Sequence, residues 1–449
     1  MKRFSYFLPF LLFTVVTVSH IEAQTVDVTI NKDGKTKSEK IEIPTSMTYP
    51  LDSLLNDWQV KNFIDQQKEC STSPLNPYFA DSVYINRLQR IPAVMEFPYN
   101  DIVRKFIDLY TTRMRNQVSF MLSAANFYIP IFEEALDAYD LPLELKYLPV
   151  IESSLNPRAV SRVGAAGLWQ FMTYTARQYG LEINSLVDER RDPIKATWAA
   201  ARYLKDLYNI YHDWNLVIAA YNCGPSNINK AVRRSGGKTD YWAIYNYLPR
   251  ETRGYVPSFI AANYVMTYYC NHNICPMETN IPISTDTIQI DKELHFDQIA
   301  AVLNIDKKMI KSLNPQYKRD IIPGNSHSYS LKLPINDISR FIDNKDSIYN
   351  YKADELLANR RTVEVEPSAE PTYYKHSSKK YSRRHSYSSR SKRHGRRNSK
   401  KSKTHTIKSG ETLSDIAERY HVSVKQLRKA NKIKGNTIRA GKKLKIRKR

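Results

Sequence analysis

The stretch Leu148-Pro149-Val150-Ile151-Glu152-Ser153-Ser154-Leu155 places one carboxylate at the end of an apolar run with helical patterning. An ionised side chain in an apolar setting is costly unless it has a task or a partner. The same setting raises the pKa of a carboxyl group, which then keeps its proton near neutral pH. Taken alone, Glu152 is interpreted more simply as a helix-surface residue that points to water. The residues that follow it decide between the two interpretations.

Three unusual peptides follow Glu152 along the chain. The second ends a predicted helix before Gly224-Pro225, which puts the polar side chains of Tyr221 and Asn222 at a helix end, where sites are often built. Capping by Asn222 is the alternative. Glu251, at the start of the third, is either a second active-site carboxylate or an acid favoured by the helix dipole. The peptides are Gly167-Leu168-Trp169-Gln170, Ala220-Tyr221-Asn222-Cys223-Gly224 and Glu251-Thr252-Arg253-Gly254-Tyr255.

A glycine-containing loop leads from Ser161 into the first of these peptides. Gly164 and Gly167 allow the backbone to turn tightly and to approach a ligand. Gln170 offers both donors and acceptors to sugar hydroxyl or acetamide groups. Trp169 either stacks on a sugar or fills the core. Glycoside cleavage needs an acid that protonates the leaving oxygen, and Glu152 in its apolar setting meets that need.

The order and spacing of these motifs closely resemble the lytic transglycosylases related to goose-type lysozyme, over roughly residues 125–273. The peptide Pro249-Arg-Glu-Thr-Arg-Gly-Tyr-Val-Pro257 and the long helical lead-in are most similar to the membrane-bound lytic murein transglycosylase D group. Cys223 departs from the family, which usually has a small Ala or Ser there. The resemblance implies a multidomain chain with a mainly α, lysozyme-like catalytic domain.

The resemblance also implies a mechanism that needs neither a cofactor nor a metal. Glu152 would protonate the oxygen between N-acetylmuramic acid and N-acetylglucosamine. It would then take the proton of the muramoyl 6-hydroxyl, which closes on C1 and leaves a 1,6-anhydro end. The residues implied to bind the sugar or tune Glu152 are Ser161, Gln170, Tyr221, Asn222, Glu251 and Tyr255.

An internal repeat lies in the C-terminal part of the chain. Residues 290–314 and 407–431 align without a gap at an offset of 117, and Asn314 matches Asn431. Each copy predicts strand, helix, helix and strand in about 45 residues, an α+β (βααβ) module. Chance similarity of two amphipathic helices is the alternative, and the ungapped register argues against it.

The second copy, residues 405–447, resembles a LysM domain, a small module that binds glycans containing N-acetylglucosamine. The first copy, residues 284–336, has Glu293 in place of Gly410 and His295 in place of Thr412. It is interpreted as a degenerate LysM module that packs against the catalytic domain, and its glycan binding is left open. The residues that match the binding loops of LysM are Gly410, Glu411, Thr412, Leu413, Asn431, Ile433, Lys434 and Gly435.

The basic charge of the chain is confined to its tail. Residues 375–403 carry 13 Lys or Arg and no acid, and residues 404–449 carry 14 against three acids. The net charge of the whole chain is +23, so the first 374 residues are close to neutral. Residues 337–404 end in a stretch with few aliphatic residues, which predicts a disordered basic linker. Such a run binds phosphate backbones nonspecifically. In an exported protein, we expect this run to contact anionic envelope polymers. We do not expect it to bind a specific nucleic acid.

The chain begins with Met1-Lys2-Arg3, an apolar run from Phe7 to about Val18, and Ile21-Glu22-Ala23. This pattern predicts a secretory signal peptide of residues 1–23, because the apolar run is too short to span a bilayer. We therefore expect export to the periplasm or cell envelope, association with peptidoglycan and no membrane-spanning helix after cleavage. Export permits disulfides among the four cysteines, Cys70, Cys223, Cys270 and Cys275. Cys270 and Cys275 are close enough to pair, and no cysteine spacing predicts a zinc site.

The predicted order of domains is a signal peptide (1–23), a mostly helical region (24–122), the catalytic domain (123–275), the degenerate module (284–336), the linker (337–404) and the LysM domain (405–447). The leading hypothesis is a peptidoglycan lytic transglycosylase that acts as a monomer on glycan strands. One alternative is a hydrolase of the lysozyme or chitinase type on the same scaffold. The other is an envelope protein that binds glycan without cleaving it.

Overall fold

The computed structural model describes residues 25–32, 35–49, 51, 54, 75–277, 284–358, 403–406, 416, 420, 422, 424–431, 433 and 442–446. The chain divides into two compact units, residues 1–369 and 370–449, and each is described by itself. The predicted signal peptide lies outside the described residues. No helix among these residues has the length and apolar character that a membrane span requires.

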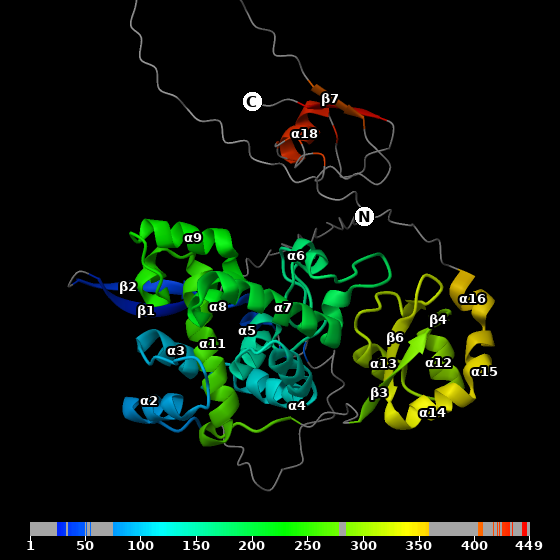
Figure 1. The fold of residues 1–449 in the computed structure, drawn as a ribbon, viewed down its shortest axis with the longest axis horizontal. Coiled ribbons are helices and arrows are strands. Elements are labelled where there is room, and N and C mark those ends of the chain that lie inside the picture. Colours follow the sequence, from blue (N-terminus) through cyan, green and yellow to red (C-terminus); the bar gives the residue numbers. More distant parts are fainter. Residues whose placement is uncertain are drawn as a thin grey trace, which may run out of the picture. The chain divides into compact units, whose positions relative to one another are not determined.

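Helices build the part of the first unit that carries the sequence motifs (Figure 1). A proline lies at or directly before the first residue of three of these helices. The Asp192 carboxylate accepts hydrogen bonds from the N–H groups of Ile194 and Lys195, at 2.9 and 3.0 Å, and so caps α7. The helix α9 begins at Pro225, and α11 begins directly after Pro249. The α-helices are α2 (Asp81–Arg90), α3 (Asp101–Thr111), α4 (Arg115–Ala138), α5 (Leu148–Ser153), α6 (Thr173–Gln178), α7 (Pro193–Tyr211), α8 (Trp214–Cys223), α9 (Pro225–Arg234), α10 (Tyr241–Ile244) and α11 (Arg250–Tyr268).

One apolar core holds these helices together. Phe106, Phe132 and Phe259 are fully buried in it, and each large side chain contributes about 2 kcal/mol to folding through its burial. The short helix α5 lies inside this core, because Leu148, Val150 and Ile151 have almost no exposed surface. The core therefore fixes the backbone that carries Glu152.

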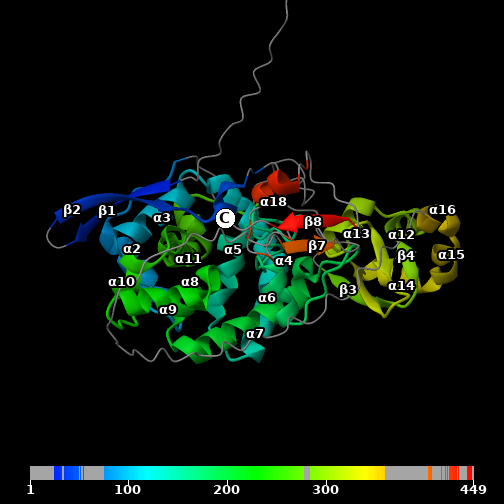
Figure 2. The same ribbon diagram turned by 90° about the horizontal axis from the view of Figure 1, so that it is seen from above.

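A β-hairpin precedes the helices, in a stretch that the sequence did not mark as strand. Strand β1 (Thr25–Lys32) pairs antiparallel with β2 (Lys35–Glu42), with Thr25 opposite Glu42. Figures 1 and 2 both show the two strands side by side, and the hairpin packs against α3 and α11. Gly254 of α11 allows this packing, because a Cβ atom there would lie 2.5 Å from the Glu42 carbonyl oxygen. The hairpin leads into the 3-10 turn η1 (Thr45–Thr48).

The first copy of the repeat forms a module around a second apolar core, as its sequence predicts. Strand β3 pairs antiparallel with β6, and β4 with β5. Two helices lie between β4 and β5, so the predicted order of strand, helix, helix and strand is confirmed. The elements are β3 (Thr285–Ile290), β4 (Glu293–His295), α12 (Phe296–Leu303), α13 (Lys307–Leu313), β5 (Ile321–Pro323) and β6 (Tyr329–Pro334).

The linker predicted for residues 337–404 starts later in the chain than expected. Residues 337–358 are not a disordered segment, because three helices continue from β6: α14 (Ile335–Asp343), α15 (Lys345–Asn350) and α16 (Ala353–Ala358). Phe341 and Ile348 are fully buried in the core of the module. These two side chains give the segment enough apolar surface to fold, which the composition of the whole linker concealed. The described residues resume at Lys403.

The second copy of the repeat shares a structural detail with the first. Its described elements are β7 (Lys403–Thr406), α18 (Val424–Asn431) and β8 (Lys443–Ile446), with β7 and β8 antiparallel. The Asn431 amide nitrogen donates to the carbonyl oxygens of Leu427 and Lys445, and its oxygen accepts from the Lys445 N–H at 2.6 Å. Asn314 makes the same three bonds to Ile310 and Lys332. The matched asparagines therefore join the second helix of each copy to its last strand.

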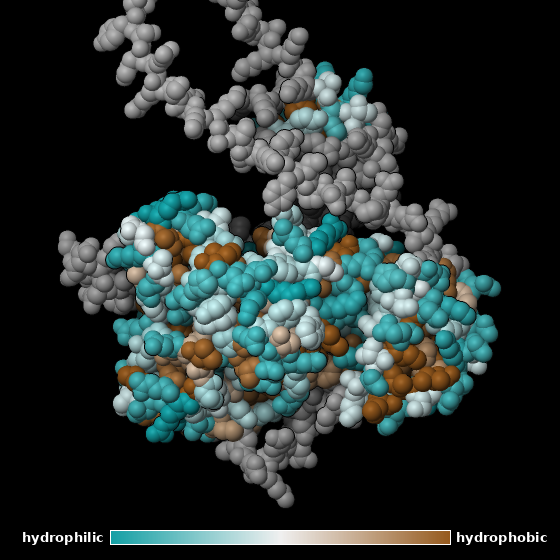
Figure 3. All heavy atoms as spheres, viewed as in Figure 1, coloured by the Kyte–Doolittle hydropathy of each residue, from teal (hydrophilic) through white to brown (hydrophobic). Residues whose placement is uncertain are grey.

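The surface of the protein mixes hydrophilic and hydrophobic side chains. Figure 3 shows the hydrophobic residues of one face in separate patches among hydrophilic ones. Exposed apolar residues of this kind, such as Ile335 and Ile342 on α14, are normal for globular proteins.

Candidate active site

Glu152 lies in the last turn of α5, at the end of the apolar run. The helix ends at Ser154, whose φ of 51° turns the chain away. The Ser153 hydroxyl donates to the carbonyl oxygens of Pro149 (3.0 Å) and Leu168 (2.9 Å), which ties the helix end to the first downstream motif. The Glu152 side chain is only half-buried, because it faces a cavity.

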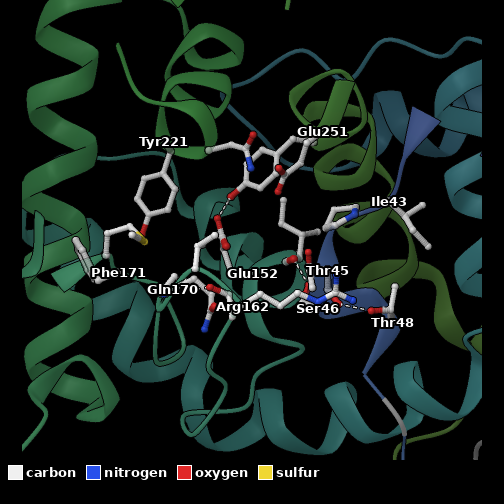
Figure 4. A pocket seen from close by; sticks show the side chains of 18 of the residues that line it. Ile43, Thr45, Ser46, Thr48, Glu152, Arg162, Gln170, Phe171, Tyr221 and Glu251 are labelled. Carbon is white, nitrogen blue, oxygen red and sulfur yellow. Dashed lines mark hydrogen bonds between the residues drawn. The ribbon is translucent and has the colours of Figure 1, made fainter. Parts of the chain in front are cut away.

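That cavity brings together all seven residues that the sequence analysis placed in the active site. Its volume is about 390 Å³. Figure 4 shows Glu152 in the middle, with Gln170 and Tyr221 on one side and Thr45 and Ser46 on the other. The seven lining residues are Glu152, Ser161, Gln170, Tyr221, Asn222, Glu251 and Tyr255. All seven side chains can therefore contact a substrate bound in this one cavity.

The surroundings of Glu152 raise the pKa of its carboxyl group to about 8, from an ordinary 4.5. Burial is the largest cause, because it disfavours the charged form. The nearby Glu251 carboxylate raises the pKa further, and the hydrogen bond that the Tyr255 hydroxyl donates to Glu152 lowers it. Glu152 therefore holds a proton at neutral pH and can act as a general acid there.

The second and third motifs meet beside Glu152. The Tyr221 hydroxyl donates to the Trp169 carbonyl oxygen at 2.8 Å, and the Thr252 hydroxyl donates to the Asn222 side-chain oxygen at 2.8 Å. Glu251 occupies the first turn of α11, so it is both a cavity residue and a helix-dipole partner. Burial and the nearby Glu42 raise the pKa of Glu251, whereas its hydrogen bond with Asn222 lowers it.

The loop between Ser161 and Phe171 forms one wall of the cavity. The Ser161 hydroxyl accepts from the Ala165 N–H at 3.0 Å, and the Gln170 amide nitrogen donates to the Gly167 carbonyl oxygen at 2.8 Å. Gly167 has a φ of 86°, and a Cβ atom there would lie 1.7 Å from the Arg190 carbonyl oxygen. The close approach that Gly167 permits is thus to the protein backbone, and not to a ligand as predicted.

Trp169 fills the core and does not face the cavity. Its side chain has no exposed surface, and its indole N–H donates to the Thr197 hydroxyl at 2.9 Å. Of the two interpretations of Trp169, the structure bears out the core aromatic.

Cys275 is disulfide-bonded, and Cys223 and Cys270 are thiols, so Cys270 does not pair with Cys275.

No sequence motif marks the opposite wall of the cavity. Six residues directly after the hairpin line it: Ile43, Pro44, Thr45, Ser46, Thr48 and Tyr49. The Ser46 hydroxyl donates to the Ile151 carbonyl oxygen, and the Ser154 hydroxyl donates to the Ser46 carbonyl oxygen at 3.0 Å. These bonds hold the segment against α5. No local pattern marks it, because its partners lie more than 100 residues away in the chain.

The predicted LysM glycan-binding residues are only partly covered by the structure. Asn431 and Ile433 are described, and Ile433 packs against the small core of the module. The Asn431 side chain is used in the bonds between α18 and β8 given above. Gly410, Glu411, Thr412, Leu413, Lys434 and Gly435 lie outside the described residues.

Three family models match separate parts of the chain. The Transglycosylase SLT domain matches residues 130–244, and the LysM-like domain of lytic transglycosylase MltD matches residues 284–350. The LysM domain matches residues 405–447.

Similar proteins carry related descriptions. Membrane-bound lytic murein transglycosylase D of Escherichia coli (strain K12) is 26% identical over 356 residues, which are 78% of this chain and 70% of that relative. Soluble lytic murein transglycosylase of Escherichia coli (strain K12) is 32% identical over 124 residues, 26% of this chain and 19% of that relative. The crystal structure of the 70 kDa soluble lytic transglycosylase of Escherichia coli is 27% identical, with a TM-score of 0.28 over 34% of this chain and 26% of that chain.

Proposed function

Because this chain combines a Transglycosylase SLT domain with an MltD LysM-like domain and a LysM domain, and is homologous to membrane-bound lytic murein transglycosylase D of Escherichia coli, we propose that it is a peptidoglycan lytic transglycosylase. The observation that carries the proposal is the position of Glu152. It is a protonated carboxyl group in a cavity that also holds the six other motif residues.

The proposed reaction uses Glu152 first as an acid and then as a base. Its proton passes to the glycosidic oxygen between N-acetylmuramic acid and N-acetylglucosamine, and the C1–O bond breaks. The resulting carboxylate takes the proton of the muramoyl 6-hydroxyl, whose oxygen bonds to C1 and closes a 1,6-anhydro ring. A pKa of about 8 suits both steps, because the group is protonated at neutral pH and is a stronger base than an ordinary glutamate.

The other cavity residues bind the sugar or tune Glu152. Tyr255 donates a hydrogen bond to the carboxylate, and this bond stabilises the charged form that appears after proton transfer. Ser161 and Gln170 offer polar atoms along one wall, and Tyr221, Asn222 and Glu251 do so at the meeting point of α8 and α11. Their placement around one carboxylate supports roles in substrate binding.

The C-terminal LysM domain, residues 405–447, supplies glycan binding and brings the enzyme to its substrate. The protein acts as a monomer in the cell envelope, after export and signal-peptide removal. The basic segment 375–403 contacts anionic envelope polymers. A pelleting assay with insoluble peptidoglycan tests both binding roles: removing residues 405–447 should lower the bound fraction, and removing residues 375–403 should lower it further at low salt.

Product analysis tests the catalytic proposal. Purified peptidoglycan is digested with the wild-type protein and with Glu152→Gln, and the released muropeptides are examined by mass spectrometry. We expect 1,6-anhydro ends from the wild type and loss of release in the variant. Reducing ends would establish the hydrolase instead, and undiminished release by Glu152→Gln would show that Glu152 is not the acid.

A further inference from the structure

In the LysM-like module, several residues that match the LysM binding segments are buried. The offset of 117 maps the LysM binding segment 410–413 onto residues 293–296, and 433–435 onto residues 316–318. In the module, Leu294 and Phe296 are fully buried, and Gln316 and Tyr317 are each only 5% exposed. A sugar cannot reach these four side chains, whereas Glu293 and His295 are half-buried and Lys318 is exposed.

The second of these segments instead pairs with the catalytic domain. The Asp188 N–H donates to the Gln316 carbonyl oxygen at 2.9 Å, and the Lys318 N–H donates to the Leu186 carbonyl oxygen at 2.8 Å. Val187 and Tyr317 form an antiparallel bridge between these two bonds. The contact is therefore a short two-stranded ladder between the domains, of the kind by which an extended segment is recognised.

Apolar packing and side-chain bonds strengthen the ladder. Leu186 and Val187 belong to the apolar core of the LysM-like module, although the chain places them in the catalytic domain. Val187 has no exposed surface. The Tyr329 hydroxyl donates to the Glu182 carboxylate at 3.0 Å. The module core is thus completed by residues of its neighbour, and the two domains pack as one structure.

The segment of the catalytic domain that forms the ladder also contacts the wall of the cavity. The Asp188 carboxylate pairs with the Arg190 guanidinium at 2.9 and 2.8 Å, and both side chains are buried. Arg190 also donates from Nη1 to the carbonyl oxygens of Gly164 (2.7 Å) and Phe171 (3.1 Å). These two carbonyls lie within the loop that carries Ser161 and Gln170. Both hydrogen bonds donated by Nη1 of Arg190 therefore hold that loop.

We infer that the LysM-like module is a docking module that positions the active-site loop 161–171 through Asp188 and Arg190, and that it does not bind glycan through residues 293–296 and 316–318. This inference rests on the proposed function only where it assigns the loop to substrate binding. Arg190 is a positioning residue, because it acts on the cavity through the backbone of the loop. The module thereby links the folding of residues 284–350 to the shape of the glycan site.

The first test weakens the docking contact in the full-length protein. Leu186→Ser removes an apolar anchor from the module core, and Leu186→Met is the matched control because it conserves volume. We expect amide hydrogen exchange in residues 161–171 to rise about tenfold in Leu186→Ser and to stay near wild type in Leu186→Met. Exchange in α7 should not change in either variant. Unchanged exchange in the loop of Leu186→Ser would overturn the inference.

Kinetics with peptidoglycan strands separate positioning from general damage. In Leu186→Ser we expect KM to rise about tenfold while the pH dependence set by Glu152 is retained, because the loop supplies the wall and not the acid. Tyr329→Phe is a milder second variant that keeps the fold, and KM should rise about threefold. A fall in kcat with an unchanged KM in both variants would contradict a positioning role. If the wild type cleaves nothing, the proposed function fails while the exchange test still decides the docking.

The final test asks where the full-length protein binds glycan. Glu152→Gln is mixed with a soluble N-acetylglucosamine oligomer, and hydrogen exchange is followed along the chain. We expect protection in residues 405–447 and no change in residues 293–296 and 314–318. Protection of residues 314–318 by the oligomer would show that the docked loop still binds glycan and would overturn that half of the inference.

Discussion

Glu152 should make the folded protein less stable as the pH rises, and Glu152→Gln should remove this effect. The pKa of its carboxyl group is 4.5 in an ordinary setting and about 8 in the fold. Between these values the folded state keeps a proton that the unfolded state has lost. The free energy of unfolding of the wild type therefore falls with rising pH in this window, and levels off above the folded pKa.

The magnitude follows from the size of the pKa shift. Each unit of pH within the window costs about 1.4 kcal/mol, so the change from pH 5 to pH 7 is about 2.5 kcal/mol. Because part of the side chain is exposed to solvent in the cavity, we expect about 2 kcal/mol. Glutamine carries no charge at either pH. The difference in the free energy of unfolding, Glu152→Gln minus wild type, should therefore widen by this amount between pH 5 and pH 7.

Denaturant unfolding at several pH values provides the assay. Tryptophan fluorescence reports on the catalytic domain, because four of the five tryptophans lie there: Trp169, Trp198, Trp214 and Trp242. Glu134→Gln, a change of an exposed glutamate on α4, is the matched control and should show no such widening. A difference between Glu152→Gln and the wild type that stays constant from pH 5 to pH 7 would refute the reasoning.

Three further predictions concern activity and the cavity wall. Activity on peptidoglycan should fall as the pH rises through about 8, because Glu152 then loses the proton that it donates, and a rate that keeps rising to pH 9 would contradict this. Tyr255→Phe removes a hydrogen bond that lowers the Glu152 pKa, so a pH–rate profile should show the alkaline limb move upward by about one unit; a downward move would be inconsistent. Gly167→Ala should lower the free energy of unfolding by about 3 kcal/mol or more in a denaturant titration, because its Cβ atom meets the Arg190 backbone. Gly164→Ala has open space and should cost only about 1 kcal/mol for its left-handed backbone, so equal losses in the two variants would exclude the packing explanation.

The residues that the structure gathers around Glu152 could be picked from the sequence where the signal is local. An apolar run that ends in Glu152 reports burial directly, and burial is the largest cause of the raised pKa. The prolines at 193, 225 and 249 mark helix starts because their chemistry restricts the backbone. The repeat is equally local, and the matched asparagines Asn314 and Asn431 make the same bonds in both copies. Such features depend on a few neighbouring residues.

Other features depend on residues that are distant in the chain and have no local pattern. Gly167 was interpreted as a place for a ligand, but its partner is the Arg190 carbonyl oxygen. Trp169 has a side chain that suits either a sugar or the core, and only its contact with Thr197 decides. The early start of the predicted linker has the same origin, because Phe341 and Ile348 become core residues only once the module has folded around them.

By itself, the sequence determined the mainly helical domain, the repeat, and the set of seven residues around one carboxylate, because periodicity, capping and motif spacing are short-range properties. The tertiary structure alone decided that the segment after the hairpin closes the other wall of the cavity and that the LysM-like module holds residues 186–188. The physical reason is that both contacts use backbone groups of segments that are distant in the chain: carbonyl oxygens that accept from Ser46 and Ser154 in the first, and paired N–H and carbonyl groups in the second. Any residue has a backbone N–H or carbonyl group to offer, so the side-chain pattern does not mark where such a contact will form.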